Sequence, residues 1–83
     1  MKVRIKYFAS IREAAGTASE TLDTEAATLV QLRDALVARG GALGVALAHG
    51  RAVRMALNQV MGDDATALQE GCEVAFFPPV TGG

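Results

Sequence analysis

The chain has 83 residues, which is enough for one small domain with a modest hydrophobic core. Hydrophobic residues make up 51% of it and charged residues 20%, as in folded globular proteins, and a net charge of −1 gives no reason to expect nucleic acid as a partner. A single cysteine excludes an internal disulfide, and the apolar runs are too short to span a bilayer, so we predict a soluble, cytoplasmic protein without a membrane partner.

Residues 1–8 alternate between apolar and basic side chains. Val3, Ile5 and Tyr7 share one face, which predicts a half-buried strand. Residues 10–15 then predict a short helical turn with Ser10 as its N-cap, ended by a glycine at position 16. Residues 19–24 predict a second strand that pairs with the first.

The basic residues are concentrated at the start of the chain. Half of them are Lys2, Arg4, Lys6 and Arg12, and no acidic residue precedes position 13. One interpretation is a solvated strand face. The other is a positive patch that meets an acidic partner.

The main helix is predicted over residues 28–39. Thr28 is the expected N-cap, with Gln31 completing a capping box, and Gly40 and Gly41 supply the stop. A second short helix is predicted over residues 42–48. The apolar stripe expected to face the core consists of Leu29, Leu32, Ala35 and Leu36.

Two further strands are predicted, over residues 53–59 and 72–77, with a turn at residues 62–64 between them. The element order predicts an α+β domain, in which a mixed sheet of four to five strands carries one major helix on one face. We assign residues 1–77 to this domain and residues 78–83 to a C-terminal tail.

Side chains for conventional catalysis are scarce. Cys72 alternates with apolar neighbours and is expected in the core, where a free cysteine behaves as a small hydrophobe. His49 lies in a polar turn, and Asp63 and Asp64 are expected to be solvated. We find no phosphate-binding glycine motif, and we predict neither a metal site nor a cofactor bound by this chain.

Alternation along the first and last predicted strands places two aromatic residues on the face opposite the core. If Tyr7 and Phe76 point inward, Phe8 and Phe77 point outward, and Met61 follows a strand close by. Exposed apolar clusters of this kind mark partner surfaces, and the alternative is that loops cover the rings.

The chain ends in Pro78-Pro79-Val80-Thr81-Gly82-Gly83. Adjacent prolines favour a stiff, extended backbone, and the two glycines have no side chain to obstruct a narrow channel. These properties suit a terminus that enters the active site of another protein and is modified there.

The segment from Gly71 to Gly83, which includes Phe76-Phe77-Pro78-Pro79-Val80-Thr81-Gly82-Gly83, closely resembles the end of the small subunits of molybdopterin synthase. Phe8-Ala9-Ser10-Ile11-Arg12-Glu13 and Ala56-Leu57-Asn58-Gln59 are similar to the same family. The resemblance implies a β-grasp, ubiquitin-like fold and a sulfur carrier that is not catalytic alone.

The resemblance also implies a mechanism. A ubiquitin-activating-type adenylyltransferase uses ATP to adenylate the carboxylate of Gly83, and sulfur then replaces AMP to give a thiocarboxylate. Gly82 gives the tail access to the large subunit, in which the sulfur is transferred to cyclic pyranopterin monophosphate during molybdenum cofactor biosynthesis. Two small and two large subunits are expected. The residues expected to bind the partner are Phe8, Met61, Phe77, Pro78, Pro79, Val80 and Thr81.

Two alternatives remain open from the sequence. In the first, the chain is a sulfur carrier for another pathway, such as thiazole synthesis. In the second, it is a ubiquitin-like protein modifier. A third interpretation is an interaction module in which the Gly-Gly end is incidental.

Overall fold

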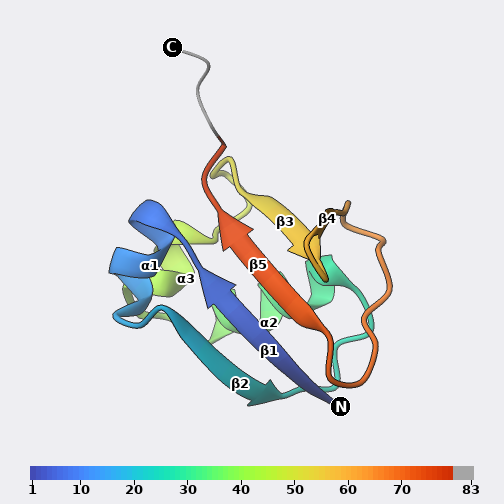
Figure 1. The fold of residues 1–83 in the computed structure, drawn as a ribbon. Coiled ribbons are helices and arrows are strands. Elements are labelled where there is room, and N and C mark those ends of the chain that lie inside the picture. The colour runs from blue at the N-terminus through green and yellow to red at the C-terminus, as the bar shows by residue number, and fades with distance from the viewer. Residues whose placement is uncertain (80–83) are drawn as a thin grey trace.

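The computed structural model describes residues 1–79, and its elements follow the predicted order closely (Figure 1). No helix within these residues is long and apolar enough to cross a membrane. The elements are β1 (Lys2–Tyr7), α1 (Ala9–Ala15), β2 (Ser19–Asp23), α2 (Leu29–Ala38), α3 (Gly41–Ala46), β3 (Arg54–Leu57), β4 (Val60–Met61) and β5 (Glu73–Phe77).

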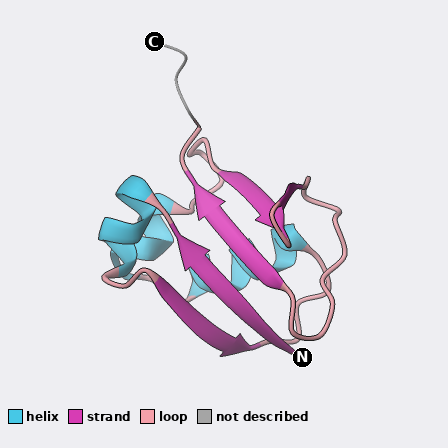
Figure 2. Ribbon diagram, viewed as in Figure 1, coloured by secondary structure: helices cyan, strands magenta, loops and turns pink. Residues whose placement is uncertain are grey.

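The strands form one mixed sheet in the order β2-β1-β5-β3-β4. The central pair, β1 and β5, is parallel, and the other three pairs are antiparallel. The helices lie on one side of the sheet, with α2 running behind β1 and β5 (Figures 1 and 2). This is the predicted α+β architecture and the β-grasp arrangement implied by the resemblance.

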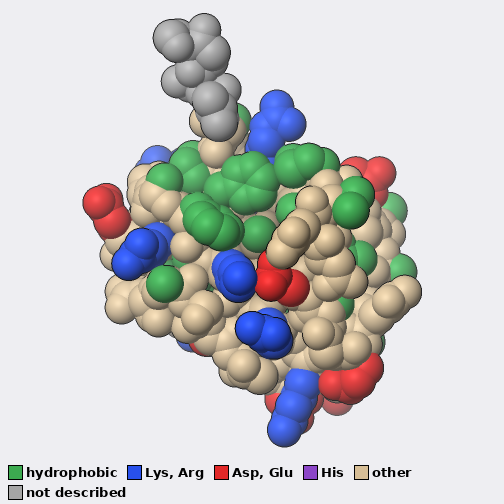
Figure 3. Space-filling view, viewed as in Figure 1, with side chains coloured by type: hydrophobic (Ala, Val, Ile, Leu, Met, Phe, Trp, Pro, Cys, Tyr) green, Lys and Arg blue, Asp and Glu red, His purple; other side chains and the backbone are tan. Residues whose placement is uncertain are grey.

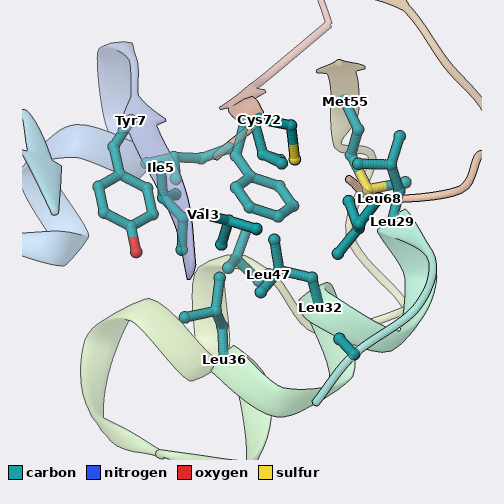
Figure 4. Close-up of a cluster of buried hydrophobic side chains, with 14 of the residues drawn as sticks. Val3, Ile5, Tyr7, Leu29, Leu32, Leu36, Leu47, Met55, Leu68 and Cys72 are labelled. Atoms are coloured by element: carbon teal, nitrogen blue, oxygen red, sulfur yellow. The ribbon is translucent and has the colours of Figure 1, made fainter. Parts of the chain in front are cut away.

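The core lies between the sheet and α2. Alternation in β1 and β5 places Val3, Ile5, Tyr7, Val74 and Phe76 on the helix-facing side, each no more than 1% exposed. Cys72 is also buried there, as predicted. The other large core residues, several of them drawn in Figure 4, are Ile11, Leu29, Leu32, Leu36, Leu43, Leu47, Met55 and Leu68.

The start of α2 confirms the predicted cap. Thr28 has extended backbone angles, and its hydroxyl accepts a hydrogen bond of 3.3 Å from the backbone N–H of Gln31. The Gln31 side chain accepts from the backbone N–H of Ala27 rather than from that of Thr28, one residue away from the predicted box. The prediction that Ala35 belongs to the apolar stripe is wrong, because Ala35 is exposed.

Helix α1 begins one residue earlier than predicted. Phe8 occupies the N-cap position, and no side chain caps the helix. Ser10 therefore lies inside the first turn, and its predicted role as the cap is wrong. Gly16 ends the helix in the left-handed conformation, with φ of 75°.

A two-residue turn that was not predicted joins β3 to β4. Asn58 and Gln59 both have positive φ, 50° and 70°, which is the backbone of a type I′ hairpin. The Asn58 side chain accepts a hydrogen bond of 2.9 Å from the backbone N–H of Glu73, and so ties the turn to the start of β5. The strand predicted over residues 53–59 is therefore shorter, and β4 begins immediately after the turn.

Candidate functional site

The site is built on the sheet face that points away from the helices. The register aligns Lys6, Ala75, Ala56 and Met61 across four strands, β1, β5, β3 and β4. Lys6 is at one end of this row and Met61, which is 51% exposed, is at the other. The two alanines between them form a floor of small side chains.

The Phe8 and Phe77 rings stand beside this row. Phe8 is 46% exposed, and its backbone N–H donates to the carbonyl of Phe76 at 3.1 Å, which holds it beside the end of β5. The two rings meet edge to face, with centroids 6.2 Å apart. This geometry is a favourable one for aromatic pairs.

The structure thus brings three predicted partner-binding residues, Phe8, Met61 and Phe77, to one face. Phe77 is only partly exposed, in contrast to the outward ring predicted, because the Phe8 ring packs against it in an edge-to-face arrangement. We call these three residues, with the floor alanines Ala56 and Ala75, the sheet-face patch. In Figure 3 hydrophobic side chains gather on this face near the end of β5.

The first two residues of the tail adjoin the sheet-face patch. Pro78 and Pro79 are half-buried and, with Phe8, Ala9 and Phe77, line an almost wholly apolar depression. Pro79 also lines a second depression, together with Met61 and Arg54. Pro78 and Pro79 therefore lie beside the patch. The other predicted tail residues, Val80, Thr81, Gly82 and Gly83, lie outside the described residues.

Polar contacts tie the end of β1, next to Phe8, to β2 and to the end of α2. The hydroxyl of Tyr7 donates to a carboxylate oxygen of Glu20 at 2.7 Å, and the guanidinium of Arg39 donates to the other oxygen at 2.9 Å. Burial, followed by the hydrogen bond to Glu20, raises the pKa of Tyr7 above its ordinary value. Burial alone would raise the pKa of Glu20, but the hydrogen bonds from Arg39 and Tyr7 outweigh it and lower this pKa.

Arg33 is a residue whose role the sequence did not reveal. It lies on α2, is only 6% exposed, and donates to the carbonyls of Leu47, Ala48 and Arg51 at 2.6, 2.9 and 3.0 Å. These carbonyls belong to the segment between α3 and β3. Residues of the same segment line depressions with Pro78 and Pro79, so Arg33 fixes backbone that flanks the start of the tail.

The remaining reactive side chains lie away from the patch. Cys72 is 4% exposed and belongs to the core, which confirms its predicted structural role. His49 is exposed, as predicted for a turn, and its ring nitrogen contacts the carboxylate of Asp34. Neither residue offers a nucleophile or base to the sheet-face patch.

Comparison with known proteins shows the family of this chain. The model of the ThiS family matches residues 5–83. The chain belongs to the ThiS family. It is also 36% identical over 81 residues to the molybdopterin synthase sulfur carrier subunit of Haemophilus influenzae, a match that covers 98% of this chain and 99% of the relative.

Two solved structures with this fold belong to proteins whose names point to different functions. One is a complex of subunits 1 and 2 of molybdopterin-converting factor from Helicobacter pylori, with a TM-score of 0.68, 27% identity and full coverage of both chains. The other is the small archaeal modifier protein 1 of Haloferax volcanii, with a TM-score of 0.76, 27% identity and coverage of 95% and 98%. Both support the β-grasp assignment.

Proposed function

We propose that this chain is the sulfur-carrier small subunit of molybdopterin synthase. The observation that carries the proposal is similarity along essentially the whole chain to molybdopterin synthase sulfur carrier subunits. The family match runs to residue 83 and so includes the Gly82-Gly83 end. The patch beside Pro78 and Pro79 offers a docking surface at the residues that begin the tail.

The proposed chemistry takes place on the carboxylate of Gly83. A ubiquitin-activating-type adenylyltransferase transfers AMP from ATP to the carboxylate and releases pyrophosphate. A sulfur nucleophile then displaces AMP and leaves a thiocarboxylate. Two such thiocarboxylates supply the sulfur atoms of the dithiolene formed from cyclic pyranopterin monophosphate. Because ATP is consumed, we place the reaction in the cytoplasm.

The chain's own contribution is binding and presentation. We propose that Phe8, Met61 and Phe77 pack against the large subunit, while residues 78–81 lead Gly82 and Gly83 into its active site. The carrier itself needs no acid or base, in agreement with the burial of Cys72 and the surface position of His49. An assembly of two small and two large subunits completes the proposal.

Reconstitution with purified partners tests this function. The chain, its adenylyltransferase, ATP, a sulfur donor and the large subunit are combined with cyclic pyranopterin monophosphate, and molybdopterin is measured. We expect product with the full chain and none with a chain that lacks Gly83. Product formation by the truncated chain would refute the proposal.

A protein modifier is the second candidate, because the fold is also similar to that of a small archaeal modifier protein. This function predicts that Gly83 becomes joined to lysine side chains of other proteins. Expression of a tagged chain in its own cells, followed by denaturing purification, distinguishes the two. A ladder of conjugates that disappears when Gly83 is deleted would favour the modifier.

A further inference from the structure

The sheet face that points away from the helices carries an excess of positive side chains, whereas the other residues of the chain carry an excess of negative ones. Alternation and register place Lys2, Arg4 and Lys6 of β1 and Arg54 of β3 on the outer face. The outward acidic residues on the strands are Asp23 and Glu73. The outer face therefore has a side-chain balance of +2, from four basic and two acidic residues. The remaining four basic and seven acidic residues of the chain give −3, consistent with −1 overall.

Both acidic residues on this face are already paired. Glu73 contacts the ammonium of Lys6 at 3.3 Å, and Asp23 contacts the N-terminal ammonium, also at 3.3 Å. Within residues 1–79, Arg4 and Arg54 are exposed and have no ion-pair partner. Asp63 and Asp64 line the same depression as Arg54 but form no ion pair with it. These two guanidinium groups are therefore available to another molecule.

The two arginines lie on opposite sides of the apolar floor. Arg54 pairs with Phe77 in the ladder, at the end of the sheet from which the tail leaves. Arg4 of β1 pairs with Glu73 of β5. This pair lies two residues before the row that contains Lys6 and Ala75, on the same face of the sheet. In Figure 3 basic side chains lie below the hydrophobic band and also above it. Any partner that covers the floor therefore meets positive charge on two sides.

We propose that the surface of the large subunit that receives the sheet-face patch carries carboxylates on both sides of an apolar centre, and that these pair with Arg4 and Arg54. The inference rests on the proposed function and adds the chemistry of the partner's surface. Charge pairs on both sides of an apolar contact fix its orientation, and they accelerate association in a salt-dependent way. Apolar packing between the rings and the partner is much less sensitive to salt.

The experiment measures binding of the full chain to the purified large subunit from the same organism at several NaCl concentrations. We expect the wild-type association rate to fall steeply between 50 mM and 500 mM NaCl, as steered association does. Arg4→Glu combined with Arg54→Glu is expected to raise Kd by roughly tenfold or more at low salt and to flatten the salt dependence.

A matched control removes the effect of net charge. Ala35 and Ala38 are exposed on α2, on the opposite side of the sheet. Ala35→Glu with Ala38→Glu lowers the net charge by two on this side, and Arg4→Glu alone lowers it by two on the outer face. We expect the control to bind within about twofold of wild type, whereas Arg4→Glu is clearly weaker. Equal losses in the two would overturn the proposal.

Carbodiimide cross-linking provides a direct readout, because it joins an amine to a carboxylate in contact with it. Arg4→Lys and Arg54→Lys keep the charge and introduce that amine. We expect each to bind like wild type and to cross-link to an aspartate or glutamate of the large subunit. If charge reversal leaves binding unchanged while Phe8→Ala weakens it, this proposal fails and the proposed function stands. If the wild-type chain does not bind the large subunit at all, the proposed function fails too.

Discussion

Replacement of Phe8 by alanine separates the docking role of the sheet-face patch from its role in folding. Full burial of a phenylalanine side chain contributes about 1.5–3 kcal/mol to the free energy of unfolding. Because Phe8 is 46% exposed in the free domain, its loss is expected to cost about 1 kcal/mol. Phe76 is 0% exposed, and its replacement by alanine is expected to cost about 3–5 kcal/mol.

The same substitution is expected to have a larger effect on binding. An aromatic anchor at the centre of an interface loses at least about 2 kcal/mol when truncated, which raises Kd roughly thirtyfold. Urea denaturation gives the first quantity, and titration calorimetry with the large subunit gives the second. Val60→Ala is the control, since Val60 is 69% exposed and pairs with Leu57 on the other side of the sheet. The reasoning is refuted if Phe8→Ala destabilises as much as Phe76→Ala, or binds like the control.

Three further predictions concern the parts that hold and extend the patch. Arg33→Met is expected to destabilise the domain by about 3 kcal/mol, since it removes three hydrogen bonds from a charged donor to backbone carbonyls, one of them fully buried. Arg39→Met removes an exposed ion pair and is expected to cost about 1 kcal/mol, and equal values in urea denaturation would contradict the role of Arg33. The lowered pKa of Glu20 means that its contribution to stability is present above its unfolded pKa, near 4.5, and is lost as the pH falls through the folded value. Glu20→Gln is therefore expected to flatten the stability profile below pH 4.5, and an unchanged acid limb would contradict the pairing. Deletion of Gly83 is expected to leave the urea midpoint unchanged, because the core lies between Val3 and Phe76, while it abolishes sulfur transfer; a shifted midpoint would place the tail in the fold.

Elements with strong local signals were predictable. The alternation of apolar and polar side chains in β1 and β5 indicated which face of each strand is buried. The cap of α2 was predictable because Thr28 and its partner Gln31 are only three residues apart. The β3–β4 hairpin had no such signal, because a type I′ turn is marked most clearly by Asn-Gly, and this chain has Asn58-Gln59. A tertiary hydrogen bond from Glu73 to Asn58 helps to hold that turn, and local sequence does not reveal such a bond.

The site was predictable where it depends on a local pattern. The alternation of side chains along β1 and β5 was sufficient to place Phe8 and Phe77 on the outer face. The contact that partly covers Phe77, and the alanine floor formed by Ala56 and Ala75, depend on strand order and register. The role of Arg33 depends on the return of a segment 14 to 18 residues away, and only the folded chain shows it.

The most direct test of the central claim is the intact mass of the chain purified from cells that make molybdenum cofactor. A thiocarboxylate on Gly83 exchanges one oxygen for sulfur, so we expect a species heavier by about 16 Da. Fragmentation is expected to place the added mass on Gly83, and deletion of the gene for the activating enzyme is expected to remove it. An unmodified C-terminus in cells with an active pathway, or a gain of about 32 Da on Cys72, as a persulfide would give, would contradict the account.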